Sequence, residues 1–409
     1  MIFAKENGRT IPKEDKIFGI SSRAKEMSNK VGKDKVVNAT IGKILDDNGN
    51  LVILKSVAEA LKELKDEDFC DYAPIGGIPE YKEAIKKTVF GKYEPKGFVE
   101  AIATPGGTGA LRNAISNYSN IGDRILVADW FWSPYKTIAQ EIGRDVITFK
   151  FFTEDGHFNV DELVNNVNEA LSYQDSLVII LNTPAHNPTG YSLSVTDFRK
   201  LRNAFEKIAQ DKKIALVVDT AYIDFAGDEE QHRQFIPVLD EMPENVLPII
   251  AFSLSKTFTL YGMRAGAMLC MAKTPAIALE FKQVCEFSSR GSWSNCTRAP
   301  QVLLAKIMND QKLRDQITGE RKDIRDMLLR RGKAFQKAAS DINLEMVPFD
   351  AGFFASIPCE NPDAVANELE KEGIFLVPLA KGIRVSIASI SEDIAKMLPA
   401  KIKAAIERI

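Results

Sequence analysis

Lys256 is the residue of this sequence whose surroundings most directly imply chemistry. It stands with Ser253 and Ser255 at the end of an apolar run over residues 246–254, and Arg264 follows eight residues later. A lysine presented by a buried strand can form an imine with an aldehyde, and hydroxyl and guanidinium groups beside it can bind a phosphate dianion. These are the needs of an enzyme that holds pyridoxal phosphate covalently. Alone the pattern is weak, because most lysines near strand ends are solvated surface charges.

A glycine-rich turn at residues 104–112 offers a second phosphate-binding element. It reads Thr-Pro-Gly-Gly-Thr-Gly-Ala-Leu-Arg and leads into a predicted helix, so the amide of Gly107 and the hydroxyl of Thr108 can hold a phosphate. A dinucleotide-binding turn would need a third glycine where Arg112 stands, and a Walker loop would need Gly-Lys followed by Ser or Thr. A plain structural turn is the alternative.

Polar residues follow two further predicted strands. Asn187, in Asn-Pro-Thr-Gly, comes after a strand that ends at residue 182, and Asp219 and Tyr222 come at the end of the next strand. Open α/β sheets bind ligands at these carboxyl ends. A carboxylate there can keep a pyridine nitrogen protonated, while an amide and a phenol can donate to a phenolate oxygen. Each residue alone is also consistent with a turn or a helix cap.

Aromatic residues and one arginine complete the candidates. Trp130 and Trp132 follow the predicted strand 125–128 and can either stack on a planar ring or pack in the core. Arg384 lies in Gly-Ile-Arg-Val-Ser-Ile, a predicted strand near the C-terminus. A guanidinium among Ile and Val needs a planar anion, which the α-carboxylate of a substrate or an internal Asp or Glu would provide.

The elements that position these residues alternate between residues 98 and 290. Short β-branched runs and amphipathic stretches follow one another, which predicts βαβ units and a mostly parallel sheet. The predicted strands are 125–128, 146–152, 176–181, 214–219, 246–253 and 266–271. The predicted helices are 108–118, 161–171, 195–209 and 276–287, with Asp161 and Ser194 as N-caps of the second and third. At 409 residues, with long charged helices after about residue 297, the chain is expected to form two domains.

Composition argues against several classes of partner. The net charge is −3 and no block of Lys and Arg stands out, so neither nucleic acid nor an anionic membrane is an expected partner. The 5 scattered cysteines and 3 histidines favour neither a disulfide framework nor a metal site. The N-terminus becomes charged after four residues, and no apolar run approaches the length of a membrane span. We therefore expect a cytoplasmic protein.

The order and spacing of these motifs resemble the fold-type I pyridoxal-phosphate aminotransferases, most closely their aspartate and aromatic amino acid branch. The resemblance runs from about residue 38 to residue 384. It implies an α/β fold with a mostly parallel seven-stranded sheet flanked by helices in a large domain, and a smaller α+β domain built from both chain ends. The implied limits are 49–310 for the large domain and 1–48 with 311–409 for the small one, joined by a long helix near 310–340.

The resemblance also implies how the cofactor is held. Lys256 would be the Schiff-base lysine and proton shuttle, and Asp219 the partner of the pyridine nitrogen. Asn187 and Tyr222 would donate to the phenolate oxygen, and Trp132, rather than Trp130, would stack on the ring. The residues implied for the phosphate are Gly107, Thr108, Ser253, Ser255 and Arg264.

Substrate and partner residues are implied in the same way. Arg384 resembles the clamp for the α-carboxylate, and residues 38–42, ending in Gly42, resemble a strand that closes over the substrate. Tyr72 resembles the tyrosine that reaches the phosphate of the neighbouring subunit, which implies a homodimer with shared active sites. Arg290, in Arg-Gly-Ser-Trp-Ser-Asn, resembles an arginine that reaches across the dimer to the distal carboxylate of a dicarboxylic substrate; a surface arginine is the alternative.

This chain departs from the family pattern near the implied pocket. Cys296 and Thr297 replace the usual Pro-Pro, and Tyr135 and Asn182 stand where histidines are common. Aspartate and glutamate are favoured as amino donors and aromatic amino acids stay possible, with 2-oxoglutarate as the expected 2-oxo acid. A β-lyase or a decarboxylase on the same scaffold is the alternative, although paired arginine clamps favour transamination. An effector module of a transcription regulator would need a helix-turn-helix domain, for which the short N-terminus leaves no room.

Overall fold

The computed structural model describes residues 3, 8–11, 15–228 and 230–409. Residues 1–2 and 4–7, which carry part of the expectation about a signal peptide, lie outside the described residues. Within the described ranges, no helix combines the length and the apolar character that crossing a membrane would require.

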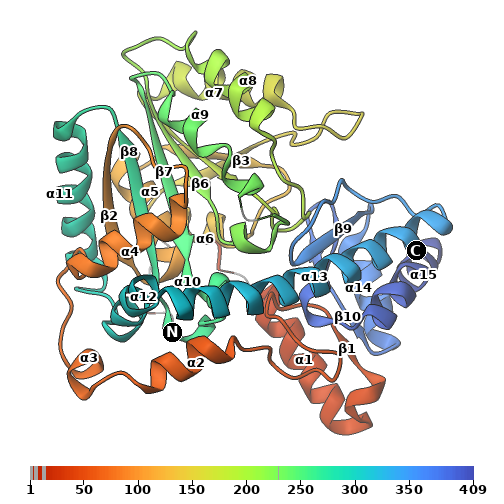
Figure 1. Ribbon diagram of the computed structural model, residues 1–409. Helices are drawn as coiled ribbons and strands as arrows, with labels where there is room; N and C mark the ends of the chain where they lie inside the picture. The colour runs from red at the N-terminus through yellow and green to blue at the C-terminus, as the bar shows by residue number, and fades with distance from the viewer. Residues whose placement is uncertain (1–2, 4–7, 12–14, 229) are drawn as a thin grey trace.

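A mostly parallel seven-stranded sheet forms the centre of the larger part of the molecule (Figure 1). Its strands, in spatial order, are β2 (Phe98–Thr104), β8 (Gly266–Ala272), β7 (Val246–Ser253), β6 (Lys213–Asp219), β5 (Ser176–Asn182), β3 (Arg124–Ala128) and β4 (Asp145–Phe149). Only β8 runs antiparallel to its neighbours β2 and β7. The central strands are buried on both faces, as parallel strands covered by helices must be. The predicted fold class is confirmed.

Helices cover both faces of this sheet. Because side chains alternate along a strand, Ile125 and Val127 face one layer of helices while Leu126 and Ala128 face the other. The first layer contains α5 (Gly106–Tyr118), α6 (Pro134–Glu141) and α11 (Pro275–Ser292). The second contains α2 (Lys55–Lys62), α4 (Pro79–Phe90), α7 (Val160–Tyr173), α8 (Val195–Phe205) and α12 (Ala299–Asn309).

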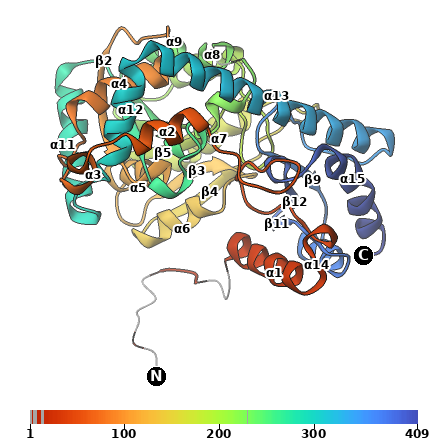
Figure 2. The ribbon, with the colours of Figure 1, turned by 60° about the horizontal axis from the view of Figure 1, so that its bottom comes forward.

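Segments from both chain ends pack together beside this sheet (Figure 2). β11 (Val377–Leu379), β12 (Gly382–Ser386) and β9 (Phe354–Pro358) form an antiparallel sheet, and β1 (Val37–Asn38) pairs in parallel with β10 (Ile374–Phe375). Helices α1 (Lys16–Val31), α14 (Pro362–Lys371) and α15 (Glu392–Glu407) lie here, and the long α13 (Gln311–Asp341) connects this part to the large sheet. The shorter elements are α3 (Asp66–Cys70), α9 (Ile236–Asp240), α10 (Leu254–Thr257), η1 (Lys33–Lys35), η2 (Ile223–Phe225), η3 (Gln231–Arg233), η4 (Tyr261–Met263) and η5 (Ile387–Ser389).

Several element boundaries differ from the predictions. Strand β4 ends at Phe149, three residues earlier than predicted, and α8 ends at Phe205 instead of residue 209. The predicted N-cap Asp161 is wrong: Asn159 accepts the backbone N–H of Glu162 and caps α7, which leaves Asp161 in the first turn. The predicted N-cap Ser194 is confirmed, with a reciprocal bond from its own backbone N–H to the side chain of Asp197.

Candidate active site

Lys256 lies in α10, a single turn of helix directly after β7. Its ammonium donates a hydrogen bond of 2.6 Å to the carbonyl of Gly42, and the ring centre of Tyr261 lies 4.6 Å from Nζ. Burial, with the positive charges of Arg264 and Arg384, lowers the pKa of Lys256 to about 7. The amine is therefore available as a base and a nucleophile near neutral pH, where an ordinary lysine is protonated.

Gly42 reaches Lys256 because it has no side chain. A Cβ atom on residue 42 would lie 2.5 Å from Cζ of Phe354, which is much closer than van der Waals contact. The segment after β1 can thus approach the lysine only with glycine at this position. The sequence prediction placed Gly42 near the substrate but did not identify its bond to Lys256.

Asp219 ends strand β6 and lies buried at the carboxyl edge of the sheet. One carboxylate oxygen accepts a 2.6 Å hydrogen bond from the hydroxyl of Tyr135, and the other accepts from the backbone N–H of Ala221 at 3.2 Å. Burial raises the pKa of Asp219 to about 6, and the bond from Tyr135 opposes this rise. A cationic ring nitrogen beside this carboxylate would favour its charged form.

Asn187 and Tyr222 lie beside Asp219 because β5 and β6 end in register. Asn182, which pairs with Asp219 across the two strands, accepts the backbone N–H of Asn187 at 2.6 Å. Asn187 in turn donates from Nδ2 to the hydroxyl of Tyr222 at 3.3 Å. Burial raises the pKa of Tyr222, so the phenol stays protonated and can donate. The structure thus brings the predicted residues Asn187, Asp219 and Tyr222 together.

The glycine-rich turn and the lysine turn meet at the same sheet edge. Gly266 of β8 pairs with Thr104 on one side and with Ser253 on the other. Arg264 donates to the hydroxyl of Ser255 at 3.5 Å. A Cβ atom on Gly106 would lie 3.0 Å from Nη2 of Arg264. Arg264 has a φ of +49°, a conformation that costs energy for a residue with a side chain and that accumulates at ligand sites. Gly107 and Thr108 lie in the first turn of helix α5 here, and Thr108 is exposed.

Arg384 projects from β12 into a buried position, only 3% exposed. It donates to the carbonyl of Thr40 at 2.6 Å and to Oδ1 of Asn187 at 3.2 Å, and its guanidinium lies 4.4 Å from the ring centre of Phe354. Neither acceptor is a carboxylate, so an internal Asp or Glu does not explain its burial. The Nε atom is buried and has no hydrogen-bond partner. A buried donor without a partner is costly, and a planar substrate carboxylate would satisfy it.

Two predicted residues lie away from this cluster in the single chain. Tyr72, 81% exposed, follows α3, and Arg290 is exposed near the end of α11, where it donates to Ser294. Trp132 is half-buried and makes an edge-to-face contact with Tyr135, whereas Trp130 is buried in the core. Trp132 therefore lies beside the ring that donates to Asp219, and its stacking on the cofactor stays a prediction.

Sequence reasoning missed three neighbours of the candidate site. Tyr261 packs against Lys256 and accepts the backbone N–H of Ile44, while Phe353 and Phe354 contact the ring of Tyr222. Tyr261 stands within the lysine motif, so its spacing from Lys256 was an available signal. No motif marks the two phenylalanines, which come from the other end of the chain.

Comparison with known proteins decides the family. Residues 34–402 match the family described as aminotransferase class I and II. This chain is a class I and II aminotransferase. A solved aminotransferase from Anaerococcus prevotii is 38% identical, with a TM-score of 0.96, over 99% of this chain and 100% of that one. The aspartate aminotransferase of Escherichia coli is 27% identical over 93% of this chain and 94% of its own length, and the aromatic-amino-acid aminotransferase of Paracoccus denitrificans is 25% identical over 88% and 91%.

Pyridoxal phosphate is the cofactor of this aminotransferase, and the residues present fit it. The cluster offers an amine of lowered pKa at Lys256, a buried carboxylate at Asp219, and an arginine and hydroxyls beside the turn at Gly106. These are the groups that an aldehyde, a pyridine nitrogen and a phosphate require.

Proposed function

We propose that this aminotransferase moves the amino group of an L-amino acid, aspartate or glutamate in preference to an aromatic one, to 2-oxoglutarate. The observation that carries the amino acid assignment is the buried guanidinium of Arg384, whose Nε lacks a partner and whose charge acts on Lys256. An α-carboxylate bound there places the α-amino group of the substrate toward Lys256. Because that carboxylate is held and retained, the arrangement favours transamination over decarboxylation.

The residues of this chain would divide the reaction among them. Bound pyridoxal phosphate supplies an electron sink that lets a proton leave the substrate Cα. Asp219 would hold a proton on the pyridine nitrogen, and Asn187 and Tyr222 would donate to the phenolate oxygen. Lys256, displaced by the incoming amine, would take the proton from Cα and return it at C4′ of the cofactor. Its lowered pKa supports the first of these transfers, because the amine must be neutral to accept the proton from Cα.

The remaining cofactor contacts follow from the same cluster. Trp132 would stack on the ring. Ser253, Ser255 and Arg264, with Gly107 and Thr108, would hold the phosphate, and Gly42 would close over the substrate beside Lys256.

We also infer a cytoplasmic homodimer with shared active sites. Tyr72 and Arg290 have no role in their own chain's cluster, yet Asn295 and Arg298 bond to the carbonyls of residues 73 and 72, so the segments that carry them lie together. Exposed Phe69 and Phe287 flank them in the sequence and supply apolar area for a subunit contact. All five cysteines are free thiols, which supports a reducing compartment.

Two chain ends would form the smaller domain. The core that joins Ala39 to residues 335–405 supports a small domain from 1–48 and 311–409, with 49–310 as the large domain and α13 as the connection.

A single-turnover screen tests the substrate assignment. The holoenzyme is mixed with each amino acid in the absence of a 2-oxo acid, and the absorbance change of the bound cofactor is followed. We expect aspartate and glutamate to react fastest, Arg290→Ala to slow only these two by roughly 10- to 100-fold, and Arg290→Lys to retain part of the rate. If Arg290→Ala leaves the rates with aspartate and glutamate unchanged, the proposed preference for dicarboxylic substrates is wrong.

A further inference from the structure

A second buried charge cluster adjoins the turn that carries Lys256. Its centre is Asp224 in η2, a fully buried carboxylate two residues after Tyr222. One carboxylate oxygen accepts a 2.6 Å hydrogen bond from the hydroxyl of Thr257, the residue that follows Lys256. The other accepts a 2.6 Å bond from Nη2 of Arg233. Asp224 is therefore joined by one side chain to the lysine turn and by its backbone to the segment that carries Tyr222.

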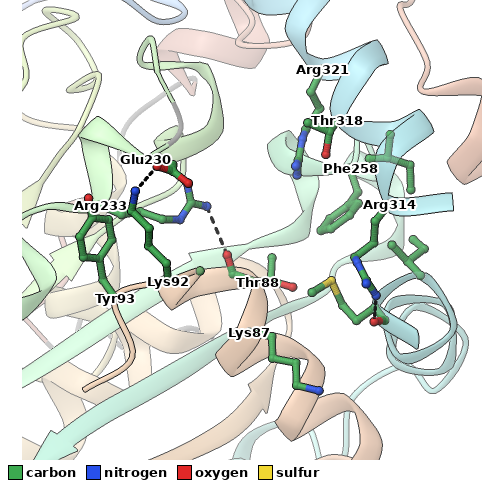
Figure 3. A pocket seen from close by; sticks show the side chains of 14 residues that line it. Lys87, Thr88, Lys92, Tyr93, Glu230, Arg233, Phe258, Arg314, Thr318 and Arg321 are labelled. Carbon is green, nitrogen blue, oxygen red and sulfur yellow. Dashed lines mark hydrogen bonds and ion pairs between the residues drawn. The ribbon is translucent and has the colours of Figure 1, made fainter. Parts of the chain in front are cut away.

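Two arginines also hold this carboxylate. Arg233, in η3, also donates to the carbonyls of Val89 at 3.0 Å and Thr88 at 3.2 Å, near the end of α4. Arg321 lies on α13. Its Nη1 is 3.9 Å from Oδ2 of Asp224, and its Cζ is 5.8 Å from the ring centre of Phe258. Figure 3 shows Arg233 and Arg321 on opposite sides of a cavity of about 230 Å³, with Phe258 on its wall. Burial raises the pKa of Asp224, but the charges of Arg233 and Arg321 outweigh it and keep the carboxyl ionised.

Stability alone does not account for this arrangement. A buried ion pair adds little net stability compared with apolar residues of the same volume, because the charges lose their hydration. The position of the cluster is more informative. Helix α10 has 4 residues, too few to hold its own conformation. The hydrogen bond from the amine of Lys256 to the carbonyl of Gly42 must break when the amine reacts.

We propose that Asp224 is a positioning residue for the reaction: through the hydroxyl of Thr257 it fixes the turn that carries Lys256 relative to Tyr222. Its two arginines anchor the carboxylate to α4 and α13, so the position of the lysine backbone does not depend on the state of its amine. This rests on the proposed role of Lys256 and adds a residue that contacts neither cofactor nor substrate.

Thr257 is the better site for the test, because removing Asp224 would leave two buried arginines without their carboxylate. Thr257→Val keeps the shape and removes only the hydroxyl. In the holoenzyme we expect kcat to fall roughly 10- to 100-fold, since small displacements of a reacting group cost this much. The KM for the amino acid should stay within about threefold, because the arginine clamps are untouched. Thr257→Ser, which restores the hydroxyl, should return kcat to within about threefold of the unmodified enzyme.

A cofactor-free readout reports the positioning itself. Amide hydrogen exchange at residues 254–258 should be faster in Thr257→Val than in Thr257→Ser, because the turn has lost its tie to Asp224. Ser119→Ala is the matched control. It removes another buried hydroxyl, one that donates to the carbonyl of Ile115 at 2.6 Å, and should lower thermal stability without changing kcat.

The results separate this proposal from the proposed function. If Thr257→Val keeps kcat within about threefold, if its loss is entirely in KM, or if Thr257→Ser is equally impaired, positioning by Asp224 is wrong. Should Thr257→Val fail to fold, Thr257→Ala replaces it in the same comparison. Lys256→Ala is measured alongside: multiple turnover in that variant would overturn the proposed function and, with it, this inference.

Discussion

At the scale of single residues, the candidate site consists of ionisable groups displaced from their ordinary pKa values. Lys256 becomes neutral near pH 7, whereas Asp219 holds its proton up to about pH 6. Both displacements come first from burial. Buried ionisable groups with displaced pKa values are typical of ligand-binding sites, because burying such a group does not by itself stabilise the folded chain.

Asp219 should therefore destabilise the cofactor-free protein at neutral pH. Its folded pKa of about 6 lies above the ordinary 3.8, so the penalty is nearly absent below about pH 4, grows between about pH 4 and pH 6, and is complete above pH 6. A shift of about two units corresponds to ~3 kcal/mol. We expect Asp219→Asn to raise the melting temperature of the cofactor-free protein at pH 8 but not at pH 4, and to reduce turnover at least about 100-fold.

Thermal unfolding at the two pH values, with and without pyridoxal phosphate, measures this effect. Ser119→Ala serves as a control whose stability change should not depend on pH. An equal change in melting temperature for Asp219→Asn at pH 4 and pH 8 would mean that the burial of this carboxylate carries no penalty.

The sequence suggests which residues could act on a ligand, but it does not show which residues act on one another. Lys256, Asn187 and Asp219 stand in short motifs whose chemistry suits one cofactor. Tyr135, by contrast, is separated from Asp219 by 84 positions. The bond between Asp224 and Thr257 spans 33 positions and belongs to no motif. Such pairs depend on which strands become neighbours, and hydrophobic patterns do not contain that information.

At the scale of elements, local hydrogen bonding decided where the helices begin. Asn159 and Asp161 are both good cap residues, and only the backbone conformation selects between them. Strand β2 was not predicted because Glu100 and two alanines dilute its β-branched signal. The reversed direction of β8 was also beyond prediction, since a fully buried apolar strand reads the same in either direction.

The capping box of α8 allows a direct test of an element. Ser194 accepts the backbone N–H of Asp197 at 3.1 Å, and Asp197 accepts the backbone N–H of Ser194 at 2.8 Å. We expect Ser194→Ala to lower the free energy of unfolding by ~1 kcal/mol. Ser194→Gly should lower it by only a few tenths of a kcal/mol. Denaturant titration measures both, and kcat should not change. A loss below about 0.3 kcal/mol for Ser194→Ala would show that water replaces this cap.

At the scale of the whole molecule, the candidate site needs both ends of the chain. The carbonyls of Thr40 and Gly42, from the N-terminal segment, accept from Arg384 and Lys256 respectively, while β12 supplies Arg384 from the C-terminal part. The pairing of β1 with β10 ties these two ends together. Movement of this smaller part relative to the large sheet would thus change access to Lys256 and the position of Arg384 at the same time.

A hybrid of two mutant subunits can show whether the sites are shared. One subunit carries Lys256→Ala and the other Arg290→Ala, each with its own affinity tag. If Arg290 acts across the dimer, one site of the hybrid combines an intact Lys256 with an intact Arg290 of the partner subunit, and aspartate turnover should recover to roughly half that of the unmodified dimer. If Arg290 acts within its own chain, aspartate turnover should be about half that of the Arg290→Ala dimer, because the one remaining reactive lysine lacks its arginine. Phenylalanine, which has no distal carboxylate, should give half turnover in either arrangement and so reports that the hybrid is correctly folded.

Sedimentation of the unmodified protein as a monomer would contradict the dimer itself, and Tyr72 and Arg290 would then need another explanation for their exposure.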